Sequence, residues 1–443
     1  MIDLRTASAG RDADKTWFSQ WVTSTQGAEG ASFGYDNRGT IGSRGRTTTA
    51  VDLASIGGTG SDGYSDYAPS RGGIGGFVSL YQSGLVQSGS LSEGPLIRIV
   101  SKGGSNGYVA EAKSAANGAD AGGVTFVQRG APITATAADL RAGVPLVWLL
   151  SQGSQGGSGG IERAIGVSGL RSDAGRGGNG RAATAEIDGI LGTTGVNLAG
   201  LRVTAQGGDG GKNGVGPFSG ARAGAGGESG EASVKIGVGG GIVTEGANAP
   251  AAIVEALAGK GGSIDVEGAV GANGGNVGGT EQRPSVLFDN RSIVKTRGDN
   301  ATAVLLQSIG GNGGEGSSDR TNGRRGGVAG DGGHIAALNA GTVMTAGDYA
   351  FGIVAQSLGG TGGRGGDGLF KGGSVLVDNM GEILPEGEEA SALVARSIGG
   401  GKALDAFQTR IPKPSEIGAG GAGGGGRRLP VLRLGRGRRQ RRR

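Results

Sequence analysis

The stretch AVLLQSIGG at residues 303–311 recurs as GIVAQSLGG at 352–360 and as ALVARSIGG at 392–400. Each copy places two or three aliphatic residues before Gln or Arg, then Ser, then Ile or Leu, and then two glycines. Weaker relatives lie upstream: VDLASIGG (51–58), LIRIVSKGG (96–104), VWLLSQG (147–153), LRVTAQGG (201–208) and AIVEALAGKGG (252–262). The chain is therefore built from an internal repeat.

The spacing of these copies is nearly regular. The first glycine after each aliphatic run lies at Gly57, Gly103, Gly153, Gly207, Gly259, Gly310, Gly359 and Gly399. Neighbouring positions in this series are 40 to 54 residues apart. A period near 50 over most of the chain predicts one architecture for all of it.

A second conserved element precedes each late copy. It is SVLFDNRSIVKTRGDNA at 285–301, GGHIAALNAGTVMTAGDYA at 332–350 and GGSVLVDNMGEILPEGEEA at 372–390, with weaker forms at 181–199 and 231–249. Alternation such as Val375 and Val377 is typical of a strand with one buried face. Asn-x-Gly and Thr-x-Gly corners favour turns that need positive φ. Each unit is thus expected to hold three short strands and a glycine-rich loop of roughly 12–20 residues.

One unit cannot bury its apolar face alone, so we expect the units to stack. The prediction is an all-β fold, a repetitive parallel β-helix or related solenoid, in which each unit fills two coils and the glycine loops protrude on one side. The handedness stays open. We divide the chain into an irregular segment at 1–30, solenoid repeats at 31–401 and a disordered Gly/Arg-rich tail at 402–443. The rival interpretation is a low-complexity chain without fixed structure.

Composition supports a thin, repetitive fold. The chain holds 104 glycines but only 9 Phe, 6 Tyr and 3 Trp, too few for a broad aromatic core. It has no cysteine, so disulfides and thiolate metal sites are excluded. We expect neither an N-terminal export signal nor a membrane-spanning helix, because no apolar run in the sequence is long enough to span a bilayer. The net charge of +5 is set by the tail, because residues 427–443 contain nine arginines and no acidic residue.

The repeats at 303–311 and 352–360 resemble the glycine-rich repeats in passenger regions of bacterial autotransporters. The resemblance extends over residues 31 to about 401 and is strongest from 285 to 400. It implies a β-helical passenger that is cell-surface exposed or secreted and often adhesive, with host cells, matrix or other cells as partners. It also implies an outer-membrane β-barrel attached covalently in the full-length parent.

The sequence departs from that family at both ends. We expect no signal peptide at the N-terminus, and after Gly401 there are no amphipathic ten-residue strands of the kind that build a barrel. Arg and Gly share GC-rich codons, so a frameshift in a GC-rich gene would yield a string such as GRGRRQRRR. We therefore hypothesise that the chain is a truncated or mis-framed piece of a longer gene product.

Catalytic and cofactor motifs are weak. His334 is the single histidine, and it occupies a position that Ser374 fills in the next repeat. The G-x-S-x-G match in GSQGGSGG at 153–160 lies in loop composition and lacks a strand–turn–helix context. Strings such as GGTGGRGGDG at 359–368 match G-x-G-x-x-G without the helix or acid that a dinucleotide site needs. We name no catalytic or cofactor-binding residue, expect no cofactor, and predict that the chain is not an enzyme.

Two further motifs have simpler explanations. GGRGGDGLF at 362–370 fits a calcium-binding nonapeptide, but such sites need tandem copies, and the other loops carry Lys212 or Glu315 where Asp367 stands. We therefore name no metal ligand. The tripeptide Arg297-Gly298-Asp299 matches an integrin-recognition sequence, yet Gly298 belongs to the repeat itself.

The sequence thus predicts a non-enzymatic surface segment, structural or adhesive, that acts by extended display and many weak contacts. The alternative is a glycine/arginine-rich nucleic-acid-binding protein that acts through its C-terminal tail by counterion release. That class would interleave arginine with glycine and aromatics along the chain, whereas here the arginines gather at one end. We therefore expect no specific nucleic-acid partner.

Overall fold

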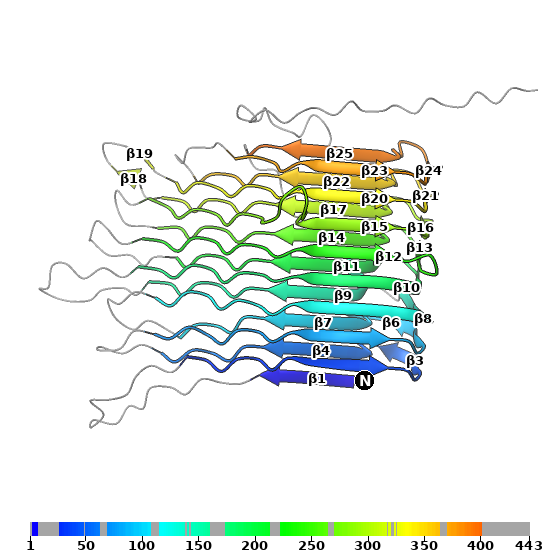
Figure 1. Ribbon diagram of the computed structural model, residues 1–443, viewed down its shortest axis with the longest axis horizontal. Coiled ribbons are helices and arrows are strands. Elements are labelled where there is room, and N and C mark those ends of the chain that lie inside the picture. Colours follow the sequence, from blue (N-terminus) through cyan, green and yellow to red (C-terminus); the bar gives the residue numbers. More distant parts are fainter. Residues whose placement is uncertain are drawn as a thin grey trace, which may run out of the picture.

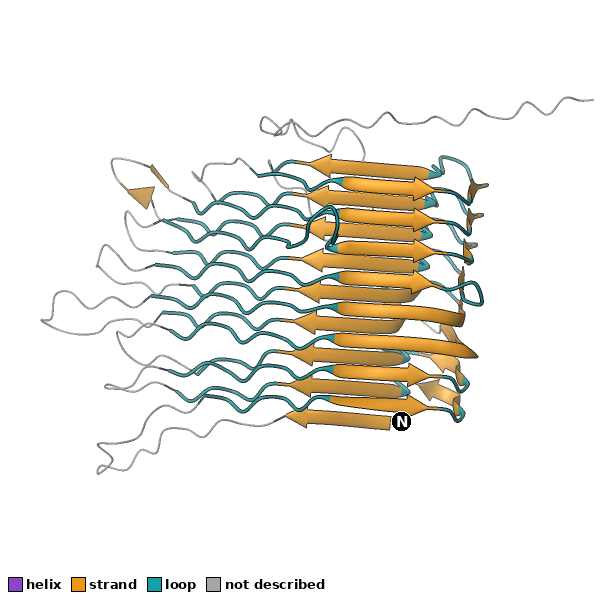
Figure 2. Ribbon diagram, viewed as in Figure 1, coloured by secondary structure: helices purple, strands orange, loops and turns teal. Residues whose placement is uncertain are grey.

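The computed structural model describes residues 2–7, 26–47, 49–62, 69–107, 115–137, 140, 143–159, 173–212, 222–264, 270–316, 318–319, 323–324, 326–363 and 370–400. Over these residues the protein is all-β, without a helix (Figure 2). In this part of the chain there is accordingly no helix long and apolar enough to cross a membrane. Nearly all strands belong to two large parallel sheets whose strands run side by side across the molecule (Figure 1).

The first sheet consists of the aliphatic runs that define the repeat. Its nine strands follow one another in chain order, and every neighbouring pair is parallel. They are β1 (Ile2–Ala7), β4 (Val51–Ile56), β7 (Ile97–Lys102), β9 (Val144–Gln152), β11 (Leu198–Gln206), β14 (Ala252–Leu257), β17 (Val304–Ile309), β22 (Ile353–Leu358) and β25 (Leu393–Ile398).

The second sheet contains 14 strands and is formed by the other element of each repeat. Its strands are β2 (Phe33–Asn37), β3 (Ile41–Thr47), β5 (Val78–Gln82), β6 (Val86–Leu91), β8 (Val124–Ala137), β10 (Ala183–Thr194), β12 (Ala232–Ile236), β13 (Gly241–Glu245), β15 (Val286–Asn290), β16 (Ile293–Thr296), β20 (Ile335–Asn339), β21 (Thr342–Thr345), β23 (Val375–Asn379) and β24 (Glu382–Pro385). A separate antiparallel pair joins β18 (Ser318–Asp319) and β19 (Gly323–Arg324).

Strand register corrects one expectation. Val304 of β17 pairs with Ile353 of β22, and Val286 of β15 pairs with Ile335 of β20. Each strand therefore meets its counterpart in the next repeat, so one repeat completes one circuit of the chain and not two. The prediction of two coils was wrong because the glycine-rich stretch, which it treated as a protruding loop, takes up much of each circuit.

The core lies between the two sheets and is mostly aliphatic. Its buried side chains come from alternate positions of both sheets, and Phe126 and Phe288 are the largest of them. A second, smaller cluster contains Ile253, Leu305 and Val354, the intervening residues of the first sheet, which point to its other face. Alternation therefore gives the buried face of the second sheet, whereas β17 and β22 of the first sheet are buried on both faces.

In four successive repeats one threonine, Thr193, Thr244, Thr296 or Thr345, fixes the turn that leads into the first sheet. The hydroxyl of Thr296 donates to the carbonyl of Ala301 at 2.7 Å, and Thr345 does the same to Ala350 at 2.9 Å. One non-glycine residue adopts positive φ in each of these four turns and in the corresponding turn of the last repeat, where proline replaces the threonine; these residues are Asn197, Asn248, Asn300, Tyr349 and Glu389. The Thr-x-Gly corners seen in the sequence are thus recurrent hydrogen-bonded turns.

Buried amides fix the other corner of the late repeats. The side chain of Asn290 donates to Asn339 at 2.7 Å, and Asn339 donates to Asn379 at 2.6 Å. Asn290 and Asn339 are fully buried, so their polar groups need these partners. This ladder holds successive corners in register.

Candidate interaction surfaces

The glycine-rich segments form a structure of their own. They extend from one end of the sheets as two arms per repeat, one leaving the first sheet and one returning to the second, and the arms of successive repeats lie side by side (Figure 2). In the outgoing arm that follows β11, Gly207, Gly208, Gly210 and Gly211 are buried, while Asp209 and Lys212 are exposed. This period of three is that of a polyproline II helix, which has three residues per turn and no internal hydrogen bonds.

Hydrogen bonds join the arms in two directions. Within the layer of outgoing arms, Gly207 donates to Leu257 at 2.9 Å and Gly210 donates to Lys260 at 2.8 Å. Between the outgoing and returning layers, Gly208 donates to Gly178 at 2.8 Å, and Gly227 donates to Gly208 at 2.8 Å. We call this double layer the glycine slab; its backbone groups are satisfied by neighbouring arms rather than within one arm.

Glycine is required in the slab because the backbones touch. A Cβ atom added to Gly208 would lie 1.9 Å from the carbonyl oxygen of Ser154, and one added to Gly227 would lie 2.0 Å from that of Gly178. No side chain can occupy such a position without moving the neighbouring arm. The collagen triple helix excludes larger residues from its axis for the same reason.

The exposed third positions carry side chains that support the backbone. The carboxylate of Asp209 accepts a hydrogen bond from the backbone N–H of Lys260 in the next repeat at 2.8 Å. Asn312 accepts from Thr361 at 2.9 Å, and Asn276 accepts from Asp331 at 2.9 Å, in the same way. Asn and Asp side chains therefore pair N–H groups that face outward, and so link one repeat to the next.

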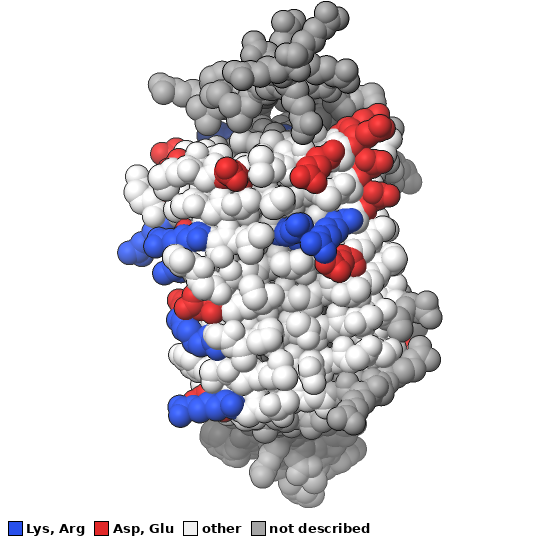
Figure 3. Space-filling view, turned by 90° about the vertical axis from the view of Figure 1, so that its right-hand side faces the viewer, with Lys and Arg blue, Asp and Glu red and all other residues white. Residues whose placement is uncertain are grey.

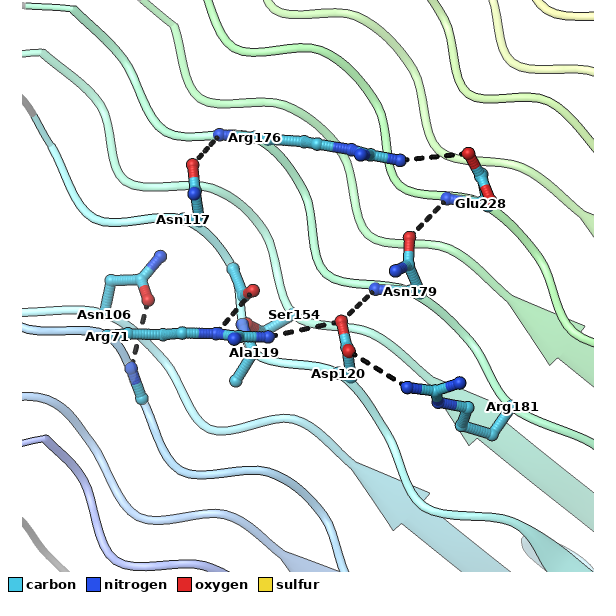
Figure 4. A network of polar contacts seen from close by, with 12 residues as sticks. Arg71, Asn106, Asn117, Ala119, Asp120, Ser154, Arg176, Asn179, Arg181 and Glu228 are labelled. Atoms are coloured by element: carbon cyan, nitrogen blue, oxygen red, sulfur yellow. Dashed lines mark hydrogen bonds and ion pairs between the residues drawn. The ribbon is translucent and has the colours of Figure 1, made fainter.

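Figure 4 shows the most connected part of this polar surface, on the returning arms. Asp120 receives ion pairs from Arg71 at 3.2 Å and from Arg181 at 3.3 Å, and it also accepts a hydrogen bond from the backbone of Asn179 at 2.8 Å. Arg176 pairs with Glu228 at 3.2 Å. Because the arginines are largely exposed, each pair contributes at most about 1 kcal/mol.

A buried serine column joins the slab to the first sheet. The hydroxyl of Ser357, in the QSLGG motif, donates to the carbonyl of Gly333 at 2.7 Å and accepts from the N–H of Gly373 at 2.7 Å. Ser101 bridges Gly76 and Gly122 at 2.8 Å each in an earlier repeat. The serine of the repeat motif thus satisfies glycine backbone groups of two successive returning arms.

The tripeptide Arg297-Gly298-Asp299 is engaged within the repeat. Arg297 forms an ion pair with Glu245, and the carboxylate of Asp299 accepts from the backbone N–H of Asp348 at 3.0 Å. A Cβ on Gly298 would lie 1.9 Å from the carbonyl oxygen of Gly246. All three residues therefore have structural contacts, as their alignment with the repeat suggested.

His334 stacks on its counterpart in the next repeat. Its Nδ1 lies 2.6 Å from the hydroxyl of Ser374, and the hydrogen bonds of its ring include no carboxylate among the described residues. No group of three His, Cys, Asp or Glu side chains in the described ranges is placed to hold a metal ion. Most of the calcium-like nonapeptide at 362–370, and all of the tail at 402–443, lie outside the described residues.

Charged side chains also line the outer face of the first sheet. Arg98 donates to both carboxylate oxygens of Asp52, at 3.0 and 3.1 Å, and its guanidinium lies 6.0 Å from the ring centre of Trp148. Partial burial, with Arg98 nearby, lowers the pKa of Lys102. Partial burial likewise lowers the pKa of Arg396. These contacts join side chains of this face to one another.

The corner face, where the strands of the second sheet turn, carries both signs of charge (Figure 3). Its basic and acidic side chains are scattered over most of its height, and acidic ones gather near the end formed by the last repeat. Glu382, Glu386, Glu388 and Glu389 are exposed in that repeat. The face therefore does not present charge of a single sign that would attract one class of charged partner.

Two exposed aromatic rings were missed by the sequence analysis. Phe77, just before β5, is 44% exposed, and Tyr81 within β5 is 52% exposed. Val78 and Leu80 between them are fully buried in the core, so Phe77, Ser79 and Tyr81 point together to the outer face of the second sheet. Alternation in FVSLYQ could have identified them, because Phe77 and Tyr81 fall out of phase with the core.

Comparison of the chain with protein-family models, with curated proteins and with solved structures gives no match.

Proposed function

We propose that the protein is a parallel β-solenoid that serves as a non-enzymatic segment on a bacterial surface, structural or adhesive in role, as the passenger of an autotransporter would be. The observation that carries this proposal is the continuous register of the repeats. Each strand of the first sheet, from β1 to β25, pairs in order with its counterpart in the next repeat. A fold that grows only by adding repeats makes a long scaffold.

The composition of the surface supports a scaffold that presents contacts. Polar side chains stand at most of the third positions in the glycine slab, and the ion pairs described above join residues of this one chain. Such a surface offers many similar, weak contact points along the direction in which the repeats stack. Binding to a repetitive partner would then gain strength through multivalency rather than through one deep site.

The test is the location of the protein on cells of the strain that carries the gene. Antibodies raised against the purified chain are applied to intact cells and to permeabilised cells, and external protease is added to a parallel sample. We expect labelling of intact cells that disappears after protease treatment. A cytosolic protein labelled in the same samples is the control for leakage. Labelling that needs permeabilisation would overturn the proposal.

A further inference from the structure

We propose that the outer face of the second sheet around Phe77 and Tyr81 binds a neutral polysaccharide. We call this area, formed by Phe77, Ser79, Tyr81 and the strands on either side of β5, the aromatic platform. This inference rests on the proposed surface role and deepens it, because it names the class of partner that an adhesive segment would contact.

The two rings contribute little to the core. Their exposed fractions of 44% and 52% contrast with those of Phe126 and Phe288, which are fully buried. The one other aromatic side chain among the exposed large apolar residues of the described structure is Tyr349. In a chain with so few aromatics, two exposed rings on one strand favour a contact role, since aromatics are the residues most enriched in binding surfaces.

The two rings flank a nearly buried serine on the same face of β5. Phe77 and Tyr81 are four residues apart on an extended strand, which separates their Cα atoms by roughly 13 Å. Ser79 between them is only 7% exposed. The neighbouring strands place Gly34 beside Ser79 and Gly123 beside Phe77. The Phe77 ring lies over Gly123, since a Cβ added to that glycine would be 3.2 Å from the ring.

A row of hydroxyl side chains extends from Ser79 across the neighbouring strands of the second sheet. Thr125 of β8 pairs with Ser79, Thr184 of β10 pairs with Thr125, and Ser233 of β12 pairs with Thr184. The hydroxyl of Ser233 donates to that of Thr184 at 3.2 Å. Thr125 and Thr184 are partly exposed, so their hydroxyls offer donors and acceptors to a chain of sugar hydroxyls, whereas Ser79 and Ser233 are buried.

The charges beside the platform are paired. Arg38 contacts Asp36 at 2.7 Å, and Arg129 contacts Glu186 at 2.8 Å and Asp188 at 3.5 Å. Because Arg38 and Arg129 each face at least one carboxylate, these two described arginines leave little net positive charge to attract a polyanion. The paired carboxylates can still accept hydrogen bonds from neutral hydroxyls, and the paired guanidinium groups can still donate to them.

Sugar rings fit this combination of groups. The polarised C–H bonds on one face of a pyranose ring meet the electron-rich face of an aromatic ring, and the equatorial hydroxyls reach the polar groups beside it. A peptide strand would need a free strand edge for its backbone, and both edges of β5, the strand that carries the rings, are already paired, with β2 and with β8. A neutral polysaccharide lying across the strands is the occupant that the geometry and charge favour.

Affinity electrophoresis of the full chain tests this inference. Native gels contain laminarin, yeast mannan or hydroxyethylcellulose as neutral probes, and alginate as a polyanionic probe. We expect at least one neutral polysaccharide to retard the wild-type protein. The double variant Phe77→Ala/Tyr81→Ala should raise the apparent dissociation constant at least tenfold. Tyr349→Asn is the matched control, since it removes an exposed ring elsewhere and Asn occupies that turn position in earlier repeats.

The outcomes separate clearly once circular dichroism shows that the variants keep the wild-type spectrum and melting temperature. Retardation by a neutral polysaccharide that is lost in the double variant and kept in Tyr349→Asn supports the inference. Absence of retardation by all three neutral probes, retardation by alginate alone, or equal retardation of the double variant would overturn it. None of these results alters labelling of intact cells, so failure here is distinct from failure of the proposed surface location.

Discussion

The sheets and the glycine slab bury their chains by opposite means. In the sheets, side chains such as Phe288 and Leu306 fill the space between two layers, and the backbone is kept apart by their volume. In the slab, the absence of side chains at positions such as Gly208 lets backbones touch, and hydrogen bonds between arms supply the cohesion. One repeat thus combines an apolar core with a region that has almost no apolar side chains, in the same circuit of chain.

The sheets should be the more sensitive region to loss of volume. We expect Phe288→Ala to destabilise the protein by about 3–5 kcal/mol, because it removes a fully buried ring and leaves a cavity between the sheets. Leu376→Ala, at a position 53% exposed in β23, is the control and should cost less than about 1 kcal/mol. Urea unfolding followed by circular dichroism measures both. Equal midpoints for the two variants would show that the core is not what holds the sheets together.

The slab should instead be sensitive to gain of volume. Gly208→Ala adds one methyl group, and we expect a loss of about 1–3 kcal/mol because the Cβ meets the backbone of a neighbouring arm. Lys212→Ala, at an exposed position in the same arm, should change stability by less than about 0.5 kcal/mol. Hydrogen exchange read by mass spectrometry would locate the effect in the arms. If Gly208→Ala protects its arm as well as the wild type does, the close packing of the slab is wrong.

The sequence contains a periodic pattern for both regions, but it allowed us to predict only the strands of the sheets and not the ordered arms of the slab. Alternation at Val375 and Val377 and the aliphatic runs gave the strands, because a buried face leaves a period of two. The period of three in GGDGGK at 207–212 was equally plain, yet glycine was weighed there only as an entropic cost. Such an arm is ordered only by hydrogen bonds to neighbouring arms some 50 residues away in sequence. The sequence of a single arm does not show that these partners are present. The exposure of Phe77 and Tyr81, in contrast, follows from alternation, because both residues are out of phase with the buried Val78 and Leu80.

Serine of the repeat motif joins the two regions, and its removal should have an intermediate effect. Ser308 accepts a hydrogen bond from the backbone N–H of Gly333 at 2.7 Å and is fully buried. Ser308→Ala leaves that N–H without its acceptor, so we expect a loss of about 1–3 kcal/mol. Ser308→Thr keeps the hydroxyl and should recover part of the loss. Since the first sheet carries Ala205 and Ala256 at the equivalent place, a neutral result would show that the junction tolerates an unpaired group.

An exposed aspartate of the slab allows the contributions of hydrogen bonding and of charge to stability to be separated, and the effect expected here is the smallest. Asp209 accepts from the backbone N–H of Lys260, and its side chain is exposed. We expect Asp209→Ala to cost about 0.5–1.5 kcal/mol, because water replaces the lost acceptor only in part. Asp209→Asn keeps an acceptor oxygen at the same place and removes the charge, as Asn179 and Asn312 do in their own repeats. If the hydrogen bond is what stabilises the arm, the Asn variant should match the wild type at low and at high salt. If the Asn variant is as unstable as the Ala variant, attraction between the carboxylate and nearby cations carries the effect, and the third positions of the slab are electrostatic rather than structural.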